Sequence, residues 1–348
     1  MRYLLLLLLT PGSIQSKDML TRTQVLMGTF VHITLHKKNN DALTKSFELI
    51  KKIENALSTY DPSASLAILN KTHNIKYDPY LAEAIKFSKS YYKDTDGYFD
   101  ISIGSISKDL YHFGEEKTYA PSKKELENAH LDIQGISIDN HHISTDENIS
   151  IDLGGMGKGY ATDKVAKYLQ EQNITEGIIA LSGDIRCLDH CEIYLQSPYS
   201  EQTFAKITSK HSQLSISTSG TYRRFANTKE AHHLINPKTA SQGREFVSVS
   251  LFSRANNAKI DAYATAISVM PKDKALAFLK NMKDIAFVIV DKQGEILFGN
   301  IETLIDIEWL SYKEKVTSPS ITRNSSTNSD IDKSLIHPDT KNPKTITR

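Results

Sequence analysis

The chain has 348 residues with 42 basic and 41 acidic side chains, a formal net charge of +1 and a hydrophobic fraction of 39%. This length allows one large domain or two medium ones, and the balanced charge lacks the basic excess typical of proteins that bind nucleic acid. We therefore expect no nucleic-acid partner, and function must be sought in local motifs.

The first sixteen residues, MRYLLLLLLTPGSIQS, combine a basic start, a six-leucine run and small polar residues. This order is typical of a short secretory signal, and the apolar run is too short to span a bilayer. No cysteine lies directly after this segment, where a lipid would be attached, so a lipid anchor is not indicated. We expect residues 1–16 to be a cleaved signal peptide and the protein to be exported, soluble and periplasmic.

Hydrophobic periodicity predicts a strand followed by helices in the first part of the chain. Strict alternation indicates a half-buried strand, whereas apolar steps of three and four residues indicate one face of a helix. On these patterns we expect a strand at 25–35, helices at 43–57 and 80–93, and short strands at 137–139 and 149–152.

Residues 151–169 read IDLGGMGKGYATDKVAKYL, a glycine-dense turn that leads into an amphipathic helix. Glycine lets the backbone approach a neighbour where a Cβ atom would collide, which suits phosphate binding. The P-loop pattern fails because Gly159 follows Lys158 where a hydroxyl is required, and Asp152 replaces the first glycine. The dinucleotide fingerprint fails at Tyr160. Two readings remain, a non-standard phosphate loop and a merely tight turn whose glycines permit positive φ.

The second half of the chain reads as strands with few helices between them. Segments 177–181, 192–196, 204–208 and 213–218 are spaced like antiparallel strands, followed by helices at 261–270 and 273–281 and a hairpin at 286–298. Because helices do not separate the strands regularly, the fold class is α+β, not a doubly wound parallel sheet. Residues 313–348 are rich in polar residues and are expected to be a disordered tail.

The only cysteines, Cys187 and Cys191, lie on either side of a three-residue turn. An exported protein meets an oxidising compartment, which favours a local disulfide. Two free thiols and a redox pair stay open as alternatives, although the C-x-x-C spacing of redox motifs is missing.

Two further segments carry side chains suited to metal binding or catalysis. Asp261 and Thr265 stand at i and i+4 of an expected helix, so their oxygens share one face and could hold magnesium or calcium. Alternatively, Asp261 caps that helix and Thr265 is simply packed. His232 and His233 would point to opposite faces of a strand, so at most one serves as a base in a given site. Zinc is not indicated, since no histidine or cysteine pair has ligand spacing.

In this order, the motifs resemble the ApbE family, the exported FAD:protein FMN transferases. The resemblance covers nearly all of residues 25–300. It rests on eight segments, which are MGT at 27–29, STYDP at 58–62 with Asn70, FD at 99–100 with Gly104, 152–163, SGDI at 182–185, SGTY at 219–222, 232–239 and DAYAT at 261–265.

The resemblance implies an α+β fold with antiparallel sheets and packed helices, ApbE-like and similar to the T-fold. It implies one large domain at 17–312, or two subdomains within it. It also implies a Mg²⁺-dependent enzyme that takes FAD as substrate, attaches FMN through a phosphoester to a threonine of a target flavoprotein subunit in a membrane redox complex, and releases AMP. The same site could instead hydrolyse FAD to FMN and AMP, or bind flavin without turnover.

Family analogy also assigns roles to individual residues. The metal ligands would be Asp261, Thr265 and the backbone carbonyls of Gly155 and Ala264, and Lys158 would pair with a phosphate. His233 is the expected general base for the acceptor threonine. The FAD pocket would be lined by Met27, Tyr60, Asp100, Asp152 and Ile235.

The chain departs from the family pattern at three positions. Asn236 and Ala240 stand where the family usually has an aspartate and a glycine, and Ser182 stands where it often has a glycine. Loss of the carboxylate at Asn236 could change how His233 is oriented or how basic it is. None of the three is an expected metal ligand.

Overall fold

The computed structural model describes residues 18–114, 117–222, 225–226, 231–310 and 315–317. The expected signal at 1–16 and most of the expected tail at 313–348 therefore lie outside the described residues. Within the tail, Lys315–Thr317 forms a short strand, β17, that pairs in parallel with β15 (Glu295–Gly299).

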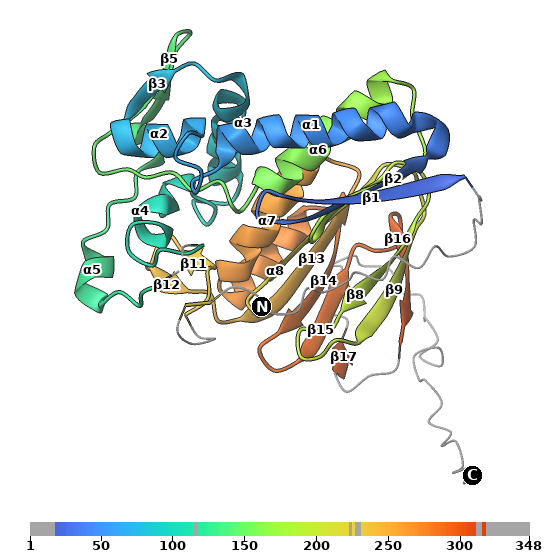
Figure 1. The fold of residues 1–348 in the computed structure, drawn as a ribbon. Coiled ribbons are helices and arrows are strands. Elements are labelled where there is room, and N and C mark those ends of the chain that lie inside the picture. Colours follow the sequence, from blue (N-terminus) through green and yellow to red (C-terminus); the bar gives the residue numbers. More distant parts are fainter. Residues whose placement is uncertain (1–17, 115–116, 223–224, 227–230, 311–314, 318–348) are drawn as a thin grey trace.

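A nine-stranded sheet forms the centre of the molecule (Figure 1). All neighbouring strands pair in the antiparallel sense except β15 and β17. In spatial order the strands are β1 (Met19–Leu26), β2 (Thr29–His36), β6 (Ile178–Leu181), β7 (Asp184–Cys187), β10 (Leu214–Gly220), β13 (Phe246–Ser253), β14 (Ile285–Asp291), β15 and β17.

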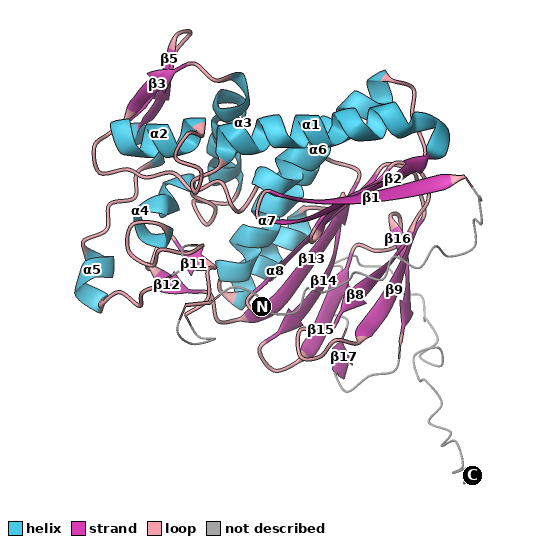
Figure 2. Cartoon of the chain, viewed as in Figure 1, coloured by secondary structure: helices cyan, strands magenta, loops and turns pink. Residues whose placement is uncertain are grey.

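Four helices cover one face of this sheet, as Figure 2 shows. They are α1 (Asn40–Leu57), α6 (Gly157–Glu171), α7 (Asn257–Val269) and α8 (Lys272–Asn281). A three-stranded sheet of β16 (Ile305–Trp309), β9 (Thr203–Ser209) and β8 (Glu192–Gln196) packs on the opposite face. The result is three layers, helices on sheet on sheet.

Strand β14 packs against the helices with one face and against the small sheet with the other. All seven of its residues are buried. Ile285, Phe287 and Ile289 belong to the core shared with the helices, whereas the alternate residues Ala286 and Val288 belong to the core shared with the small sheet. Successive side chains of a strand point to opposite faces, so a continuous apolar run is what a sheet covered on both sides requires.

A smaller region sits beside the ends of α1 and α7 (Figure 1). It contains a three-stranded sheet, a two-stranded ribbon, one 16-residue helix and three shorter helices. Its elements are α2 (Ser65–Thr72), β3 (Asn74–Lys76), α3 (Pro79–Asp94), α4 (Gly104–Ser107), α5 (Lys123–Glu127), β4 (Ile136–Ile138), β5 (His142–Thr145), β11 (Ile235–Asn236) and β12 (Ser241–Gln242).

The α+β prediction and most predicted helices are confirmed, but two strand predictions are wrong. Residues 25–35 are not one strand, because Met27 and Gly28 form a two-residue turn between β1 and β2, with φ of 52° and 68°. Two positive φ values are typical of a type I′ hairpin turn. Residues 149–152 are not a strand. In addition, the four segments expected in one sheet divide between the nine-stranded and three-stranded sheets.

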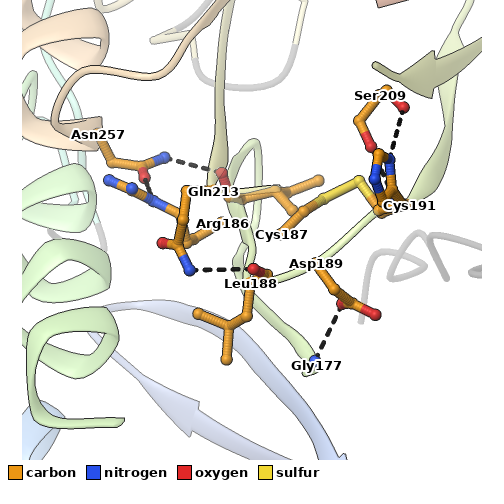
Figure 3. The surroundings of a disulfide bond; sticks show 11 residues. Gly177, Arg186, Cys187, Leu188, Asp189, Cys191, Ser209, Gln213 and Asn257 are labelled. Carbon is orange, nitrogen blue, oxygen red and sulfur yellow. Dashed lines mark hydrogen bonds between the residues drawn. A yellow bond between two sulfur atoms is a disulfide. The ribbon is translucent and has the colours of Figure 1, made fainter. Parts of the chain in front are cut away.

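Cys187 and Cys191 form a disulfide, as expected, and the described residues contain no free cysteine. The bond closes the turn between β7 and β8, and both cysteines are buried in the core under the small sheet (Figure 3). Among the described residues, no helix combines the length and the apolar composition needed to cross a membrane.

Candidate active site

The glycine turn is anchored from two sides before it enters α6. The side-chain amide of Asn70 donates to the carbonyl of Ile151 (2.9 Å) and accepts from its amide (2.8 Å). The next residue, Asp152, donates its backbone N–H to Ile101 (2.8 Å) and accepts from the N–H of Gly154 through its side chain (2.8 Å). These bonds fix the path of residues 151–154, and they explain why an extended segment here is not part of a sheet.

Close packing against α7 requires two of the four glycines. A Cβ at Gly159 would lie 2.5 Å from the carbonyl oxygen of Asn257, and one at Gly155 would lie 3.0 Å from Cγ2 of Thr265. None of the four glycines at 154, 155, 157 and 159 has a positive φ. The reading that these glycines permit positive φ is therefore wrong. Close approach to α7, by the turn at Gly155 and by α6 at Gly159, accounts for two of them.

A buried charge cluster lies where α6 begins. Lys158 Nζ is 3.0 Å from Oδ2 of Asp184 and 3.5 Å from Oδ2 of Asp261, and both carboxylates are almost fully buried. The backbone N–H of Gly159 also donates to Asp261 (3.1 Å), and Ser217 donates to Asp184 (2.7 Å). Burial and the negative charge of Asp184 raise the pKa of Asp261 to about 7.

Asp261 is not a helix cap, since α7 starts at Asn257 and its N-cap is Asn256. It lies in the second turn, and Thr265 follows one turn later. The Thr265 hydroxyl donates to the carbonyl of Gly155 (3.3 Å), so this helix face does meet the glycine turn. Ala264 is buried, and its carbonyl accepts from the hydroxyl of Ser268 (2.7 Å).

The donor set here fits a hard divalent cation. Asp261, Thr265 and the Gly155 carbonyl are all oxygen ligands, which magnesium and calcium prefer. The 3.3 Å between the Thr265 and Gly155 oxygens is near the roughly 3 Å expected for adjacent ligands of magnesium. Two buried carboxylates beside Lys158 also leave negative charge for a cation to offset. No cluster of three or more His, Cys, Asp or Glu side chains suited to a metal occurs among the described residues, so carbonyl and hydroxyl ligands would be essential.

A second cluster joins Asp152 to Tyr60 through Lys108. The ammonium of Lys108 lies 3.6 Å from Asp152 Oδ2, donates to the Tyr60 hydroxyl (2.5 Å) and stands 4.2 Å above the Tyr60 ring. Ser107 also donates to Asp152 (2.7 Å). Tyr60 remains 52% exposed, so its ring could contact a ligand.

The remaining expected pocket residues lie in different surroundings. Met27 is near the start of α6, with its terminal carbon 3.7 Å from a Cβ placed at Gly157. Asp100 is buried and accepts from the amide and hydroxyl of Ser102, and burial raises its pKa. Ile235 is buried in a small cluster with Ile106, Tyr111 and Phe113.

The two histidines have distinct environments. His232 is buried, donates from Nε2 to the carbonyl of Gly243 (2.8 Å) and accepts at Nδ1 from the amide of Leu234 (3.3 Å). Burial lowers the pKa of His232, so it is a neutral structural group. His233 is half-buried. Its segment is tied to the end of α7, because the Asn236 amide donates to the carbonyl of Val269 (3.0 Å).

Sequence reasoning gave no role to several residues of this region. Asp184 was visible in the SGDI motif, and a carboxylate directly after a glycine is a signal that could have marked it. Lys108 had no comparable signal, because only folding brings it to Asp152 and Tyr60. The structure thus unites Gly155, Lys158, Asp261 and Thr265, and forms a separate Tyr60–Asp152 cluster.

A family model described as "ApbE family" matches residues 27–289 of the chain. A protein named FAD:protein FMN transferase from Klebsiella pneumoniae (strain 342) is 25% identical over 80% of this chain and 92% of its own length. One of the same name from Treponema pallidum (strain Nichols) is 24% identical over 81% of this chain and 88% of its own.

Solved structures show the same fold. The ApbE protein of Thermotoga maritima aligns with a TM-score of 0.73 at 23% identity, covering 80% of this chain and 96% of that one. The flavin transferase ApbE from Vibrio cholerae aligns with a TM-score of 0.68 at 21% identity, covering 84% of this chain and 97% of that one.

Proposed function

The chain belongs to the ApbE family, and we propose that it is a Mg²⁺-dependent FAD:protein FMN transferase. It would transfer FMN from FAD to a threonine hydroxyl of a target flavoprotein and release AMP. The observation that carries the proposal is the convergence of Asp261, Thr265, Gly155 and Lys158 at the start of α6. Curated relatives named FAD:protein FMN transferase, matching most of the chain, supply the chemistry to which this site is suited.

Asp261, Thr265 and the Gly155 carbonyl would hold the metal, and the Ala264 carbonyl could do so only while also accepting from Ser268. A bound Mg²⁺ would neutralise charge on the diphosphate and so assist its cleavage. Ionised Asp261 is the form that binds a cation, and its raised pKa of about 7 means that protons compete with the metal below neutral pH.

The substrate would lie between the two clusters. Lys158 would face the diphosphate, since its ammonium and the positive end of the α6 dipole both favour anions. The exposed ring of Tyr60 and the side chain of Met27 would contact the flavin or adenine rings. Asp100 and Asp152 would bond their polar edges, and Ile235 would support the wall from the buried side.

His233 would remove the proton from the acceptor threonine as its oxygen attacks the FMN phosphorus. A new phosphorus–oxygen bond to threonine forms, the bond to the AMP phosphate breaks, and AMP leaves with the bridging oxygen. His232 is unsuited to this task because both of its ring nitrogens have structural partners. We place the reaction in the periplasm, on a subunit of a membrane redox complex.

The test incubates the purified mature protein with FAD, Mg²⁺ and a threonine-bearing flavoprotein subunit. We expect AMP by chromatography and an FMN adduct on the threonine by mass spectrometry, both lost without divalent metal. AMP without an adduct would instead assign FAD hydrolysis. FAD binding without AMP, under any divalent metal, would assign a flavin carrier and overturn the proposal.

A further inference from the structure

The N-terminus of α7 is capped by a residue of another helix. Its own N-cap, Asn256, makes no side-chain capping bond. Instead the carboxylate of Asp163, from α6, accepts from the N–H of Asn257 (2.8 Å) and of Ala258 (2.9 Å). The first N–H groups of a helix have no partner within it, and a carboxylate there also interacts favourably with the helix dipole. Asp163 therefore ties the start of α7 to α6.

Arg186 extends this contact into the sheet. It donates from Nη2 to Asp163 (2.7 Å) and from Nε to the side-chain oxygen of Asn257 (2.8 Å). The Asn257 amide in turn donates to the carbonyls of Ile185 and Ile216, on β7 and β10. Figure 3 shows the Arg186 and Asn257 side chains facing each other. We call Asp163, Arg186 and Asn257 the α6–α7 clamp.

The clamp lies one helical turn from the charge cluster on both helices. Asp163 is four residues after Gly159, and Asp261 is four residues after Asn257. Gly159 and Asp261 are themselves bonded (3.1 Å), so the two helices share two successive cross-links. Because a close-packed interior transmits strain, we expect a change in the clamp to displace Asp261 relative to Gly155 and Lys158.

We infer that the α6–α7 clamp is a positioning device for the metal ligand Asp261, and that Asp163 is its central residue. This inference rests on the proposed function, because it takes Asp261 to hold the metal. Asp163 acts through the first N–H groups of α7, to which it is bonded, and so fixes where α7 begins. Supporting groups of this kind commonly change metal affinity by about 10–100-fold when replaced.

The chain offers a matched control in Asp291. Like Asp163, it pairs with one basic side chain at 2.7 Å, that of Lys272, and accepts from two backbone N–H groups (2.9 Å each). It lies at the end of β14, outside α6 and α7. Asp163→Asn and Asp291→Asn therefore remove comparable ion pairs, and both should lower the melting temperature.

The experiment titrates Mn²⁺ into each full-length mature variant without FAD and follows free Mn²⁺ by electron paramagnetic resonance. We expect Asp163→Asn to weaken Mn²⁺ binding by about tenfold or more, with Asp291→Asn within about twofold of wild type. If Asp163→Asn binds Mn²⁺ as tightly as Asp291→Asn does, the inference is wrong. Should Asp163→Asn not fold, Arg186→Lys replaces it, since it keeps the charge but loses the geometry of the Asn257 bond.

Hydrogen exchange separates this inference from the proposed function. If wild type binds no Mn²⁺, the metal site fails, yet exchange can still be compared for peptides over 157–163 and 257–265. The clamp predicts that Asp163→Asn accelerates exchange in both peptides by about tenfold more than Asp291→Asn does. Equal exchange in the two variants would overturn the clamp on its own.

Discussion

The two faces of the nine-stranded sheet bury similar apolar side chains but different polar groups. The helix-covered face carries buried Asp184, Arg186 and Asp261 and half-buried Asp163 among its aliphatic residues. The face under the small sheet carries an aliphatic and aromatic cluster joined by the disulfide. Burying charge costs free energy unless the group is paired and hydrogen-bonded, so its concentration on one face marks where chemistry, not stability, dictates the residues.

This difference predicts that substitutions on the two faces affect activity and stability in opposite ways. On the helix face, replacing the buried carboxylate of the proposed metal site, Asp261, should remove activity with little loss of stability. On the opposite face, a replacement should lower stability with little change in activity. The following predictions test this division.

The largest expected effect is on activity, from Asp261→Asn. We expect AMP release to fall on the order of 10³-fold, because the variant lacks the proposed metal ligand next to the diphosphate. At pH 8 the carboxylate is ionised although buried, since its pKa is about 7. The neutral amide of asparagine removes the free-energy cost of burying an ionised carboxylate, so the melting temperature should stay level or rise. Calorimetry measures the melting temperature at pH 8, and an AMP assay at the same pH measures activity. If both fall together in this variant, the proposed difference between the two faces is wrong.

A smaller loss of activity is expected from His233→Gln, with His232→Gln as the neighbouring control. Loss of a general base is expected here to lower the rate by about 10²-fold, the lower end of the usual range, whereas removal of a buried hydrogen-bonded group lowers stability by about 1–3 kcal/mol. We therefore expect His233→Gln to slow FMN transfer while FAD affinity persists. Single-turnover rates measure the loss of the general base, and urea midpoints measure the loss of stability. If the two variants have equal rates, His233 is not the general base.

The sequence predicted those parts of the site that are local in the chain. The i and i+4 spacing of Asp261 and Thr265 and the glycine turn at 151–159 needed only helix periodicity and glycine chemistry. The Lys158–Asp184 and Arg186–Asp163 ion pairs join residues on different elements, so no local pattern could reveal them. The β1–β2 hairpin was missed because Met27, unlike asparagine or glycine, is not typical of a turn position with positive φ.

On the opposite face, the double replacement Cys187→Ala and Cys191→Ala tests the disulfide. Chain entropy for so short a loop predicts a loss of about 2 kcal/mol in the free energy of unfolding. AMP release at 25 °C should remain within about twofold of wild type, because the disulfide lies under the small sheet. Urea unfolding of the variant, and of wild type treated with reductant, provides the measurement. A large loss of activity in the folded variant would show that the two faces are coupled.

The smallest effect concerns pH and His232. Burial, aided by the positive charge of Arg244, lowers the pKa of His232 from its ordinary 6.5, so the unfolded chain binds a proton more readily than the folded protein. The contribution is fully present above pH 6.5 and is lost as pH falls through the folded pKa, by no more than about 1.4 kcal/mol per pH unit. Asp261 acts in the opposite direction, since its raised pKa lets protonation stabilise the fold below about 7.

The His232 contribution is isolated by comparing wild type with His232→Gln, in which Asp261 is unchanged. Urea unfolding at pH 7.5 and pH 5.5 gives each protein a difference in stability between the two conditions. Because only wild type carries the buried imidazole, its difference should exceed that of the variant by up to about 1.4 kcal/mol. Identical differences would mean that folding does not lower the pKa of His232, contrary to the structural partners of its Nε2 and Nδ1.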